Sequence, residues 1–556
     1  MKTLAKITTL AALAALVLSG CQAKKIAGLN TTVYPISVTP EALRDIAANN
    51  PGDEAIVIKT DAPYWIVTCS DWIKPDVTHG VGGGKGQIIT LHFESNYKGE
   101  AKTTEPRSGE VKISGGMNSF VVSVNQLGHE AVIDPSASIG GIPDLDEFKD
   151  FVNAVNDGGA LNRWTNEAGE IALLADLDLS GLDEWTPIGD VEKTDNGNNA
   201  SKPTGEFFTG VFNGGGHTIS GFKATATLAA NKTWGLFGYV QDGTIKDLNL
   251  TGVDITIGAT GAADAGVVVG TLKNSTIENV TVSGKLDLKG STSTTRFAMG
   301  GIAGFIVSEK KEDQTEATVN TLVKGCSVTL TVKGDRGSNT GNGATGCHFG
   351  GIAGFSTNVS KDISLVKIES CTAGGDITSN FGRSSGIVAA ANYGTLIEGS
   401  TNNMDQVNTF SGGTGGRIAN ITCILGQNGG ITDCVNNGSI TTTESNCQSG
   451  GLVCLLNHAS VYIKGGANYG DIISAFVTDA SGRDFRGLLC ANFSAFGEVT
   501  GVTVSGRVGK YVANGTPQWL DVNADNFIEG KYIGYWKDDA AKAKITGLTY
   551  VAPSAP

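Results

Sequence analysis

Acidic and basic side chains recur at one position of a repeat in the second half of the chain, where they could line a cleft and act on a polysaccharide. The row reads Lys246, Glu278, Lys324, Glu369, Glu398, Thr432, Lys464 and Thr500. Because charges of opposite sign alternate, neighbours neutralise one another, and each pair adds about 0.2 to 1 kcal/mol to a solvated ladder. A catalytic base also needs a shifted pKa in a pocket, and no residue pattern marks one. We therefore predict no catalytic residues, with a polysaccharide-active lyase or hydrolase as the alternative.

Metal and cofactor chemistry has little support in the sequence. Residues 521–525 begin like a calcium-binding loop, but Asn526 takes the place of the required Gly and Tyr532 that of the bidentate Glu. No two cysteines have the C-x-x-C spacing of a zinc site. We expect no metal ion and no cofactor.

The cysteines fit a packed core better than a set of disulfides. Those that follow Cys21 are odd in number. Cys326, Cys371 and Cys434 share one inward-facing position of the repeat. Buried cysteine behaves as a small hydrophobic residue, so the spacing favours core packing over cross-links.

Four tryptophans are candidates for stacking on a sugar ring. They are Trp65, Trp72, Trp519 and Trp536. Indole rings also supply much of the burial energy of a core, and this interpretation is favoured for Trp65 and Trp72. The other two lie in an aromatic C-terminal segment that would cover the open end of a solenoid.

Internal repetition is the strongest signal of architecture. Repeats begin at Gly235, Gly266, Gly301, Gly351, Gly386, Ala419, Gly451 and Gly487. A second position is always β-branched: Ile245, Ile277, Val323, Ile368, Ile397, Ile431, Ile463 and Val499. Three residues later stand Leu248, Val280, Cys326, Cys371, Ser400, Cys434, Gly466 and Val502. Such columns become continuous when coils stack about 4.8 Å apart, so we predict an all-β chain with a right-handed parallel β-helix. Asn402, Asn436 and Asn468 are predicted to form a stacked asparagine ladder.

Three phrases within the repeat carry a resemblance to a known family. Trp234–Gly238, Gly300–Phe305 and Gly350–Phe355 resemble the GLUG motif of bacterial adhesin-like proteins. An amphipathic helix is expected over Asp144–Asn156. We assign residues 131–225 to an N-terminal cap and first coil, 226–510 to the repeats and 511–556 to a C-terminal cap. The resemblance implies adhesion or extracellular scaffolding.

Residues 30–130 show short alternating segments broken by turns, which predict a small antiparallel sandwich. Trp65 and Trp72 with Ser70 between them, Arg107–Val111, and Val124–Gly128 resemble a BACON domain, an immunoglobulin-like module associated with Bacteroidetes. The resemblance implies carbohydrate binding. A spacer that holds the next domain away from a membrane is equally consistent.

The first residues have the layout of a secretory signal peptide. Lys2 and Lys6 precede an apolar run over Ile7–Leu18 that is too short to span a bilayer. The following residues up to Cys21 resemble the lipobox of bacterial lipoproteins. The resemblance implies a signal peptide over 1–20, a lipid on Cys21 and a linker over 21–29. We expect an outer-membrane lipoprotein on the cell surface, with the periplasmic face as the alternative because Gln22–Lys25 contains no acid.

The net charge of -14 opposes nucleic-acid binding. We expect a monomer that is anchored to the membrane by its lipid and that acts in adhesion or in binding glycans or host surface proteins. A structural surface spacer is a further alternative. The insertions Ser308–Ala317, Lys333–Thr345 and Asp405–Gly416 are expected to be surface loops that contribute to binding.

Overall fold

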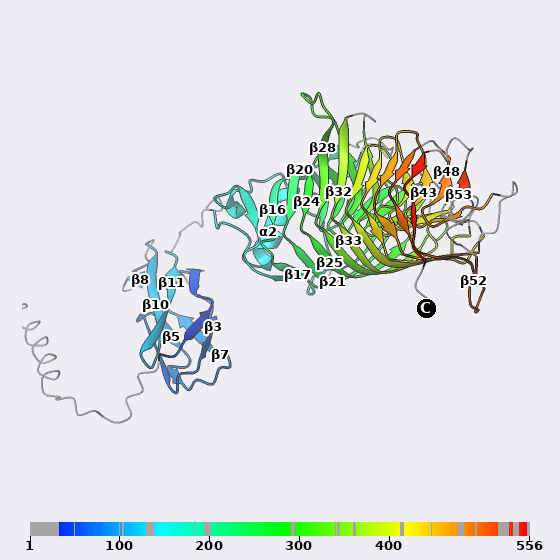
Figure 1. Cartoon of the computed structure of the whole chain (residues 1–556). Helices are drawn as coiled ribbons and strands as arrows, with labels where there is room; N and C mark the ends of the chain where they lie inside the picture. The colour runs from blue at the N-terminus through cyan, green and yellow to red at the C-terminus, as the bar shows by residue number, and fades with distance from the viewer. Residues whose placement is uncertain are drawn as a thin grey trace, which may run out of the picture. The chain divides into compact units, whose positions relative to one another are not determined.

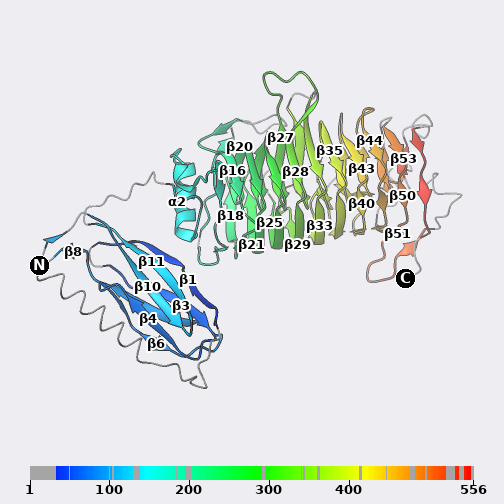
Figure 2. The same ribbon diagram turned by 60° about the vertical axis from the view of Figure 1, so that its left-hand side comes forward.

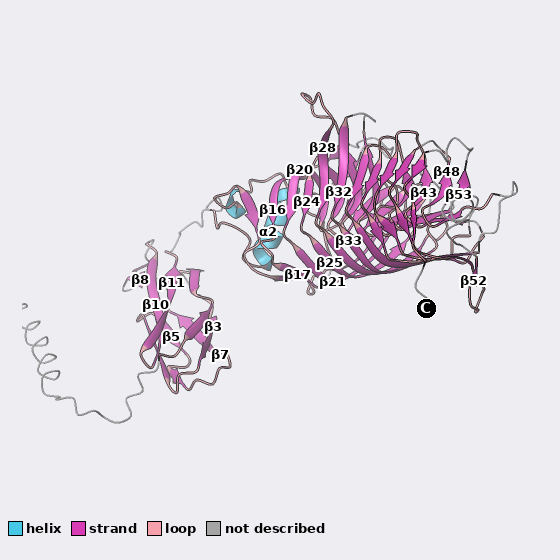
Figure 3. Cartoon of the chain, in the orientation of Figure 1, coloured by secondary structure: helices cyan, strands magenta, loops and turns pink. Residues whose placement is uncertain are grey.

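The structure is a computed structural model that divides into two compact units, residues 1–135 and 136–556. The described residues are 33–48, 51–98, 101–102, 105–128, 138–182, 184–193, 202–290, 295–339, 341, 345–359, 363–411, 416–445, 447–475, 483–494, 497–520, 533–536 and 544–552. Within them the chain is mostly strand (Figure 3), which confirms the all-β prediction. No helix in this part of the chain is long and apolar enough to cross a membrane.

The first unit consists of two sheets around one core. One sheet has the order β1 (Ile36–Thr39), β3 (Glu54–Thr60), β7 (Gln87–Phe93) and β5 (Ile73–Pro75). The other has the order β2 (Ala42–Ile46), β11 (Asn118–Gln126), β10 (Arg107–Gly115), β4 (Trp65–Cys69) and β6 (His79–Gly80). A small hairpin joins β8 (Tyr97–Lys98) to β9 (Ala101–Lys102). Neighbouring strands are antiparallel except β11 with β2, and Figure 2 shows β10 and β11 side by side. Buried side chains from both sheets share the core because alternate residues of each strand face inward.

The second unit is a stack of chain turns, each paired in parallel with the turn before it (Figure 1). Sheet I consists of β19 (Thr233–Trp234), β22 (Ala263–Gly266), β26 (Phe297–Gly300), β30 (Cys347–Gly350), β34 (Arg383–Ser385), β37 (Gly416–Ala419), β42 (Cys447–Gly450) and β47 (Arg486–Gly487). Sheet II consists of the first half of β20 (Phe237–Lys246), β23 (Val269–Lys273), β27 (Ala303–Ser308), β31 (Ala353–Asn358), β38 (Thr422–Leu425), β43 (Val453–Leu456), β48 (Cys490–Phe493) and β53 (Ile533–Trp536). This pairing is compatible with a parallel β-helix.

Two further sheets complete each turn. Sheet III contains β12 (Glu170–Ala172), β16 (Phe208–Asn213), the second half of β20, β24 (Thr276–Glu278), β28 (Thr318–Lys324), β32 (Ser364–Glu369), β35 (Thr395–Glu398), β39 (Gly430–Thr432), β44 (Tyr462–Lys464), β49 (Glu498–Thr500) and β54 (Ile545–Thr546). Sheet IV contains β13 (Leu177–Asp178), β17 (Thr218–Ser220), β18 (Lys223–Leu228), β21 (Asn249–Ala259), β25 (Thr281–Lys289), β29 (Ser327–Asp335), β33 (Thr372–Ser379), β36 (Thr401–Asn408), β40 (Val435–Asn436), β41 (Ile440–Thr442), β45 (Ala467–Asn468), β46 (Ile472–Ser474), β50 (Thr503–Val504), β51 (Val508–Lys510) and β55 (Thr549–Tyr550). The short strand β52 (Gln518–Trp519) adds to β51 in the antiparallel direction.

The predicted β-branched column runs along sheet III, with one residue in each strand. Strand pairing places each member beside the next, from Ile245 to Val499, and every one is fully buried. The column also extends to Ile171 and Phe212 before the repeat and to Ile545 after it. The prediction of the column is therefore confirmed, and the stack is longer than the repeat pattern indicated.

Both ends of the stack differ from the predicted boundaries. Residues 131–225 contain two turns, because β12 and β16 both pair in parallel within sheet III. Within residues 511–556, where a cap was predicted, the described strands β53, β54 and β55 make a further turn paired with β48, β49 and β50. These turns lack the glycine phrases on which the prediction depended.

The glycine column needs a correction of one residue. Pairing in sheet I aligns Gly235, Gly266, Gly300, Gly350, Ser385, Ala419, Gly450 and Gly487. The predicted members Gly301, Gly351, Gly386 and Gly451 lie one residue further along. Three of them follow another glycine, so the sequence did not distinguish the two positions, although a shift of one residue exchanges the faces of a strand.

A helix and its cap close the first turn. Helix α2 (Leu145–Asn156) begins after Asp144, whose side chain accepts a hydrogen bond from the Glu147 amide, and its buried face includes Phe148 and Phe151. The Phe151 ring lies 6.0 Å from the Phe212 ring. The predicted amphipathic helix is confirmed. The short 3-10 helix η1 (Asn162–Trp164) follows, and a small hairpin of β14 (Glu192–Lys193) and β15 (Pro203–Thr204) lies further along the chain.

The predicted asparagine ladder is present in sheet IV. The Asn402 amide donates to Oδ1 of Asn436 at 2.7 Å, and the Asn436 amide donates to Oδ1 of Asn468 at 2.6 Å. The amide of Asn436 also donates to the Gly438 carbonyl at 2.8 Å. All three side chains are buried. The ladder therefore gives hydrogen-bond partners to its buried side-chain amides and to the Gly438 carbonyl.

The predicted insertions are shorter than expected. The loop after Ser308 ends where β28 begins at Thr318, as predicted. However, β29 continues to Asp335 and β36 to Asn408, so Lys333 and Asp405 lie in strands that pair with the next turn. The surface loops begin only after these residues.

Two adjacent isoleucines in β46 offer a matched test of the core. Ile472 is fully buried whereas Ile473 points the other way and is partly exposed. Replacing Ile472 with Ala should lower the free energy of unfolding by about 2–5 kcal/mol, and replacing Ile473 with Ala by less than about 1 kcal/mol. Denaturant titration checks both variants. Equal losses would contradict the assigned faces.

The asparagine ladder can be tested at its central rung. Asn436→Ala removes one partner each from Asn402 and Asn468, and a buried polar group left unpaired costs about 1–3 kcal/mol. The neighbouring Asn437 is exposed, so Asn437→Ala should change stability by less than about 0.5 kcal/mol. Thermal unfolding of the two variants compares them directly, and no difference between them would contradict the ladder's structural role.

Candidate functional site

The structure gives the candidate tryptophans different environments. Trp65 is only 1% exposed and packs in the core of the first unit, so it leaves no ring face open to a sugar, which corrects its selection as a binding residue. Trp72 is half-buried with the Arg107 guanidinium 4.4 Å from its ring centre. Trp519 is 37% exposed and has the Arg507 guanidinium 3.9 Å from its ring centre. Both rings already have a cation over one face.

Two predicted site residues are not described at the level of their side chains. Cys21 lies outside the described residues. Trp536 ends strand β53, but its side chain lies outside them. The calcium-like segment 521–526 also lies outside them, and among the described residues no cluster of His, Cys, Asp and Glu could hold a metal ion.

The charged row on sheet III has the predicted register, but the ion pairs of its members go to Glu170 and Lys367, which stand outside the row. Nζ of Lys246 lies 2.6 Å from Glu170, and Nζ of Lys367 lies 2.8 Å from Glu398 and 3.3 Å from Glu369. The hydrogen bond from Lys246 is the main cause that lowers the pKa of Glu170, and the bond to Glu170 raises the pKa of Lys246. Both shifts stabilise the charged forms. These pairs act as a solvated ladder and not as an acid–base couple.

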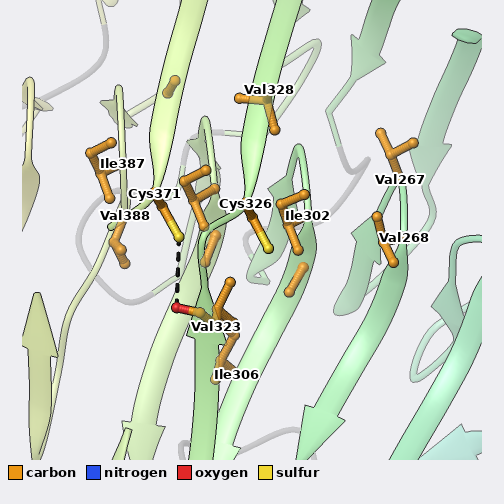
Figure 4. Close-up of a cluster of buried hydrophobic side chains, with 14 of the residues drawn as sticks. Val267, Val268, Ile302, Ile306, Val323, Cys326, Val328, Cys371, Ile387 and Val388 are labelled. Carbon is orange, nitrogen blue, oxygen red and sulfur yellow. Dashed lines mark hydrogen bonds between the residues drawn. The ribbon is translucent and has the colours of Figure 1, made fainter. Parts of the chain in front are cut away.

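The inward cysteines pack as the sequence predicted. Cys326 and Cys371 lie among aliphatic side chains of the core (Figure 4), where the Cys371 thiol donates to the Val323 carbonyl at 3.6 Å. The nine described cysteines are free thiols. Burial raises the pKa of Cys434 and of Cys490 to about 12, so these thiols stay protonated and unreactive at neutral pH.

A second row of side chains lies outside the main core, on the other face of sheet I. Strand pairing aligns Asp264, Ala298, His348, Arg383, Arg417 and Gln448 along it. Their neighbours Ala265, Met299 and Phe349 face the main core. Opposite this row, sheet II presents Phe305 and Phe355, which pack with Ala298 in a separate small cluster. The two sheets therefore enclose side chains on their outer faces as well.

The first part of this outer row is filled, and its buried cations share one carboxylate. Asp264 is completely buried and pairs with Lys193 of β14 and with Arg296, whose Nη2 lies 3.2 Å from its carboxylate. The Arg296 guanidinium lies 4.7 Å from the Phe305 ring centre and 4.6 Å from that of Phe355. Burial acts to raise the pKa of Asp264, but the charges of Lys193 and Arg296 outweigh it and hold this pKa below its usual value.

The next part of the row contains a cavity of about 300 Å³. We call it the arginine pocket, and it is lined by Phe355, Arg383, Asn392, Arg417, Ile424, Leu455 and Asn457. It lies where the sheet II row changes from Phe305 and Phe355 to the smaller Ala390, Ile424 and Leu455. The space that aromatic rings fill in earlier turns therefore becomes an open volume.

Two guanidinium groups from adjacent strands meet at the arginine pocket. Arg383 and Arg417 are register partners in β34 and β37. Arg383 is 5% exposed, and Nε of both arginines is buried without a hydrogen-bond partner. Burial, and next the charge of Arg417, lower the pKa of Arg383 to about 9, so it remains cationic at neutral pH. Among the described residues, no carboxylate forms an ion pair with either arginine.

Sequence reasoning missed the arginine pocket although a signal was present. Arg383 and Arg417 each stand two residues before the corrected repeat position at Ser385 and Ala419. Earlier turns place Asp264, Ala298 and His348 there. The predicted glycine column was displaced by one residue in several turns, so it did not align Arg383 and Arg417 with these earlier residues.

Comparisons with known proteins give limited similarities. No family model matches the chain. A stretch of 162 residues, 28% of the chain, is 34% identical to Halomucin of Haloquadratum walsbyi and spans 2% of that protein's length. Among solved structures, a Bacteroides ovatus GH5 xyloglucanase in complex with a XXXG heptasaccharide matches 20% of this chain and 22% of its own, with a TM-score of 0.15 and 23% identity. An IgA1 protease matches 90% of this chain and 26% of its own, with a TM-score of 0.35 and 13% identity. These structural likenesses are too distant to assign a function.

The buried triad around Asp264 predicts a specific acid sensitivity. Asp264→Asn leaves Lys193 and Arg296 buried without a counter-charge and should lower the free energy of unfolding at pH 7 by about 3–5 kcal/mol. Because the pKa of Asp264 is lowered in the folded state, its contribution is present above the unfolded pKa of about 4 and is lost as the pH falls below it.

The variant should therefore lose less stability than the wild type between neutral and acid pH, as measured by denaturant titration over that range. The control is Asp287→Asn, which removes an exposed carboxylate paired with Lys289 and should cost less than about 1 kcal/mol. A triad variant within 1 kcal/mol of the wild type at pH 7 would contradict the assigned role.

Proposed function

We propose that the protein is a lipid-anchored envelope protein that acts in adhesion or carbohydrate binding through the side of its stacked second unit. The arginine pocket carries this proposal, since it is a cavity of about 300 Å³ with apolar walls and a few convergent polar groups. That combination is typical of a ligand site. The similarity of part of the chain to Halomucin fits a surface protein related to glycans.

The proposal assigns a role to each part of the chain. The second unit is a right-handed parallel β-helix of the GLUG-like adhesin kind that presents the binding face. The first unit is an immunoglobulin-like, BACON-like stalk, supported by its two sheets around one core. A lipid on Cys21 holds the monomer in the outer membrane facing outward, with the periplasmic face as the alternative.

Binding is favoured over catalysis by the groups present at the site. The residues that line the arginine pocket supply two guanidinium groups, two amides and three apolar side chains. Glycosidases need a pair of carboxyl groups, and this lining set contains none. On sheet III, where a lyase would place its charged cleft, Lys246 pairs with Glu170, and Lys367 pairs with Glu369 and Glu398.

The expected result is ligand binding without turnover. Purified chain from residue 22 onward should bind a subset of glycans or matrix proteins on an array. The same preparation should release no unsaturated products from polysaccharides, as followed by ultraviolet absorbance. Clear turnover would replace the proposal with a polysaccharide-active enzyme, and an array without any bound ligand would leave a structural spacer.

The proposed surface location has an independent test. Protease added to intact cells should degrade residues 130–556, because the second unit would be exposed to the medium. A periplasmic protein that stays undegraded in the same cells establishes that the outer membrane is closed. Protection until the outer membrane is opened would assign the protein to the periplasmic face.

A further inference from the structure

The two arginines of the pocket lack the acidic partner that buried cations have elsewhere along the same row. Register partners on parallel strands lie about 4.8 Å apart, and like charges at this spacing repel. Asp264, at one end of the row, forms ion pairs with both Lys193 and Arg296, so each of these buried cations has an acidic partner. Arg383 is equally buried, and its charge is uncompensated among the described residues.

An anionic group would complete this arrangement. The planar guanidinium donates paired hydrogen bonds that match a carboxylate or sulfate. Nε of Arg383 and Nε of Arg417 are buried donors without a hydrogen-bond partner, in two residues that line the cavity. The net charge of -14 opposes general attraction of polyanions, so recognition must come from this local pair of cations.

The other lining residues indicate that the anionic group belongs to a sugar. Asn392 and Asn457 provide amide donors and acceptors for hydroxyl groups, while Phe355, Ile424 and Leu455 provide apolar walls for a sugar ring. Hydroxyl, apolar and anionic surfaces occur together in acidic sugars. A cavity of about 300 Å³ is of the size that holds a small ligand group.

We propose that the arginine pocket binds the carboxylate or sulfate of an acidic sugar residue within a glycan, with Arg383 and Arg417 as its anion-binding pair. This inference rests on the proposed binding function and specifies its ligand class. It predicts that acidic glycans are bound and that their neutral counterparts are not.

The test is an array that carries sulfated, uronate-containing and sialylated oligosaccharides beside their neutral counterparts, probed with the chain from residue 22 onward. Arg383→Gln and Arg417→Gln should each weaken binding to the acidic members at least about ten-fold, because each removes charge-assisted hydrogen bonds. Arg417→Lys should also weaken binding, because an ammonium group lacks the planar fork. Lys324→Gln on sheet III makes the same change in net charge and should leave binding unchanged.

Thermal unfolding without ligand checks that the variants fold. Arg383→Gln should not lower Tm, because it removes an uncompensated buried charge. The half-buried Arg417 gives a second variant that disturbs the interior less.

Each outcome of the array decides the inference. Binding confined to sulfated or to carboxylated members supports it and identifies the anion. If both glutamine variants still bind acidic glycans, or if the protein prefers neutral glycans, the arginine pocket is not the anion-binding site. The proposed binding function would remain intact in either case. Absence of any bound glycan or matrix protein overturns both, and binding of phosphopeptides in place of glycans overturns the sugar assignment.

Discussion

The fold of the second unit depends on apolar contact between equivalent residues of successive turns. A single turn has no other turn against which to bury its inner face, and stacking creates a core only if an apolar side chain lies over the one below. The column from Ile171 to Ile545 meets this condition, with a β-branched or aromatic residue at each step. Every other feature of the unit is arranged around that column.

The stacking requirement also controls the polar groups of the interior. A buried side chain with hydrogen-bonding atoms is tolerated when its neighbours above and below supply complementary donors and acceptors. Asn402, Asn436 and Asn468 satisfy one another in this way. The asparagine ladder and the β-branched column are thus two solutions to one constraint, one polar and one apolar.

Sequence predicted the features that repeat and missed those that change between turns. The correctly predicted features each depend on a local or periodic pattern. They are the β-branched column, the asparagine ladder, the inward cysteines and helix α2. One coil was predicted before the repeats, where β12 and β16 give two turns, and the last turn was missed because the segment around Ile545 lacks the glycine phrases of the repeats. The arginine pocket depends on which side chains two different sheets place opposite each other, and one sequence without a register does not contain this information. One position of sheet II is another such difference: it holds Gly354, then Ala389, Cys423 and Cys454 in the following turns. Glycine fits at the first of these because a Cβ at Gly354 would lie 2.5 Å from the Met299 amide nitrogen.

The buried thiols have a consequence for how the chain reaches its folded state. Because Cys326, Cys371 and Cys434 are buried as free thiols among apolar side chains, the stack requires no oxidant and no correct choice among competing thiol pairs. The same contacts form in a reducing or an oxidising compartment. A chain of this kind needs no thiol–disulfide exchange enzymes to fold, and a change in the redox potential of its surroundings would leave these buried thiols unaltered.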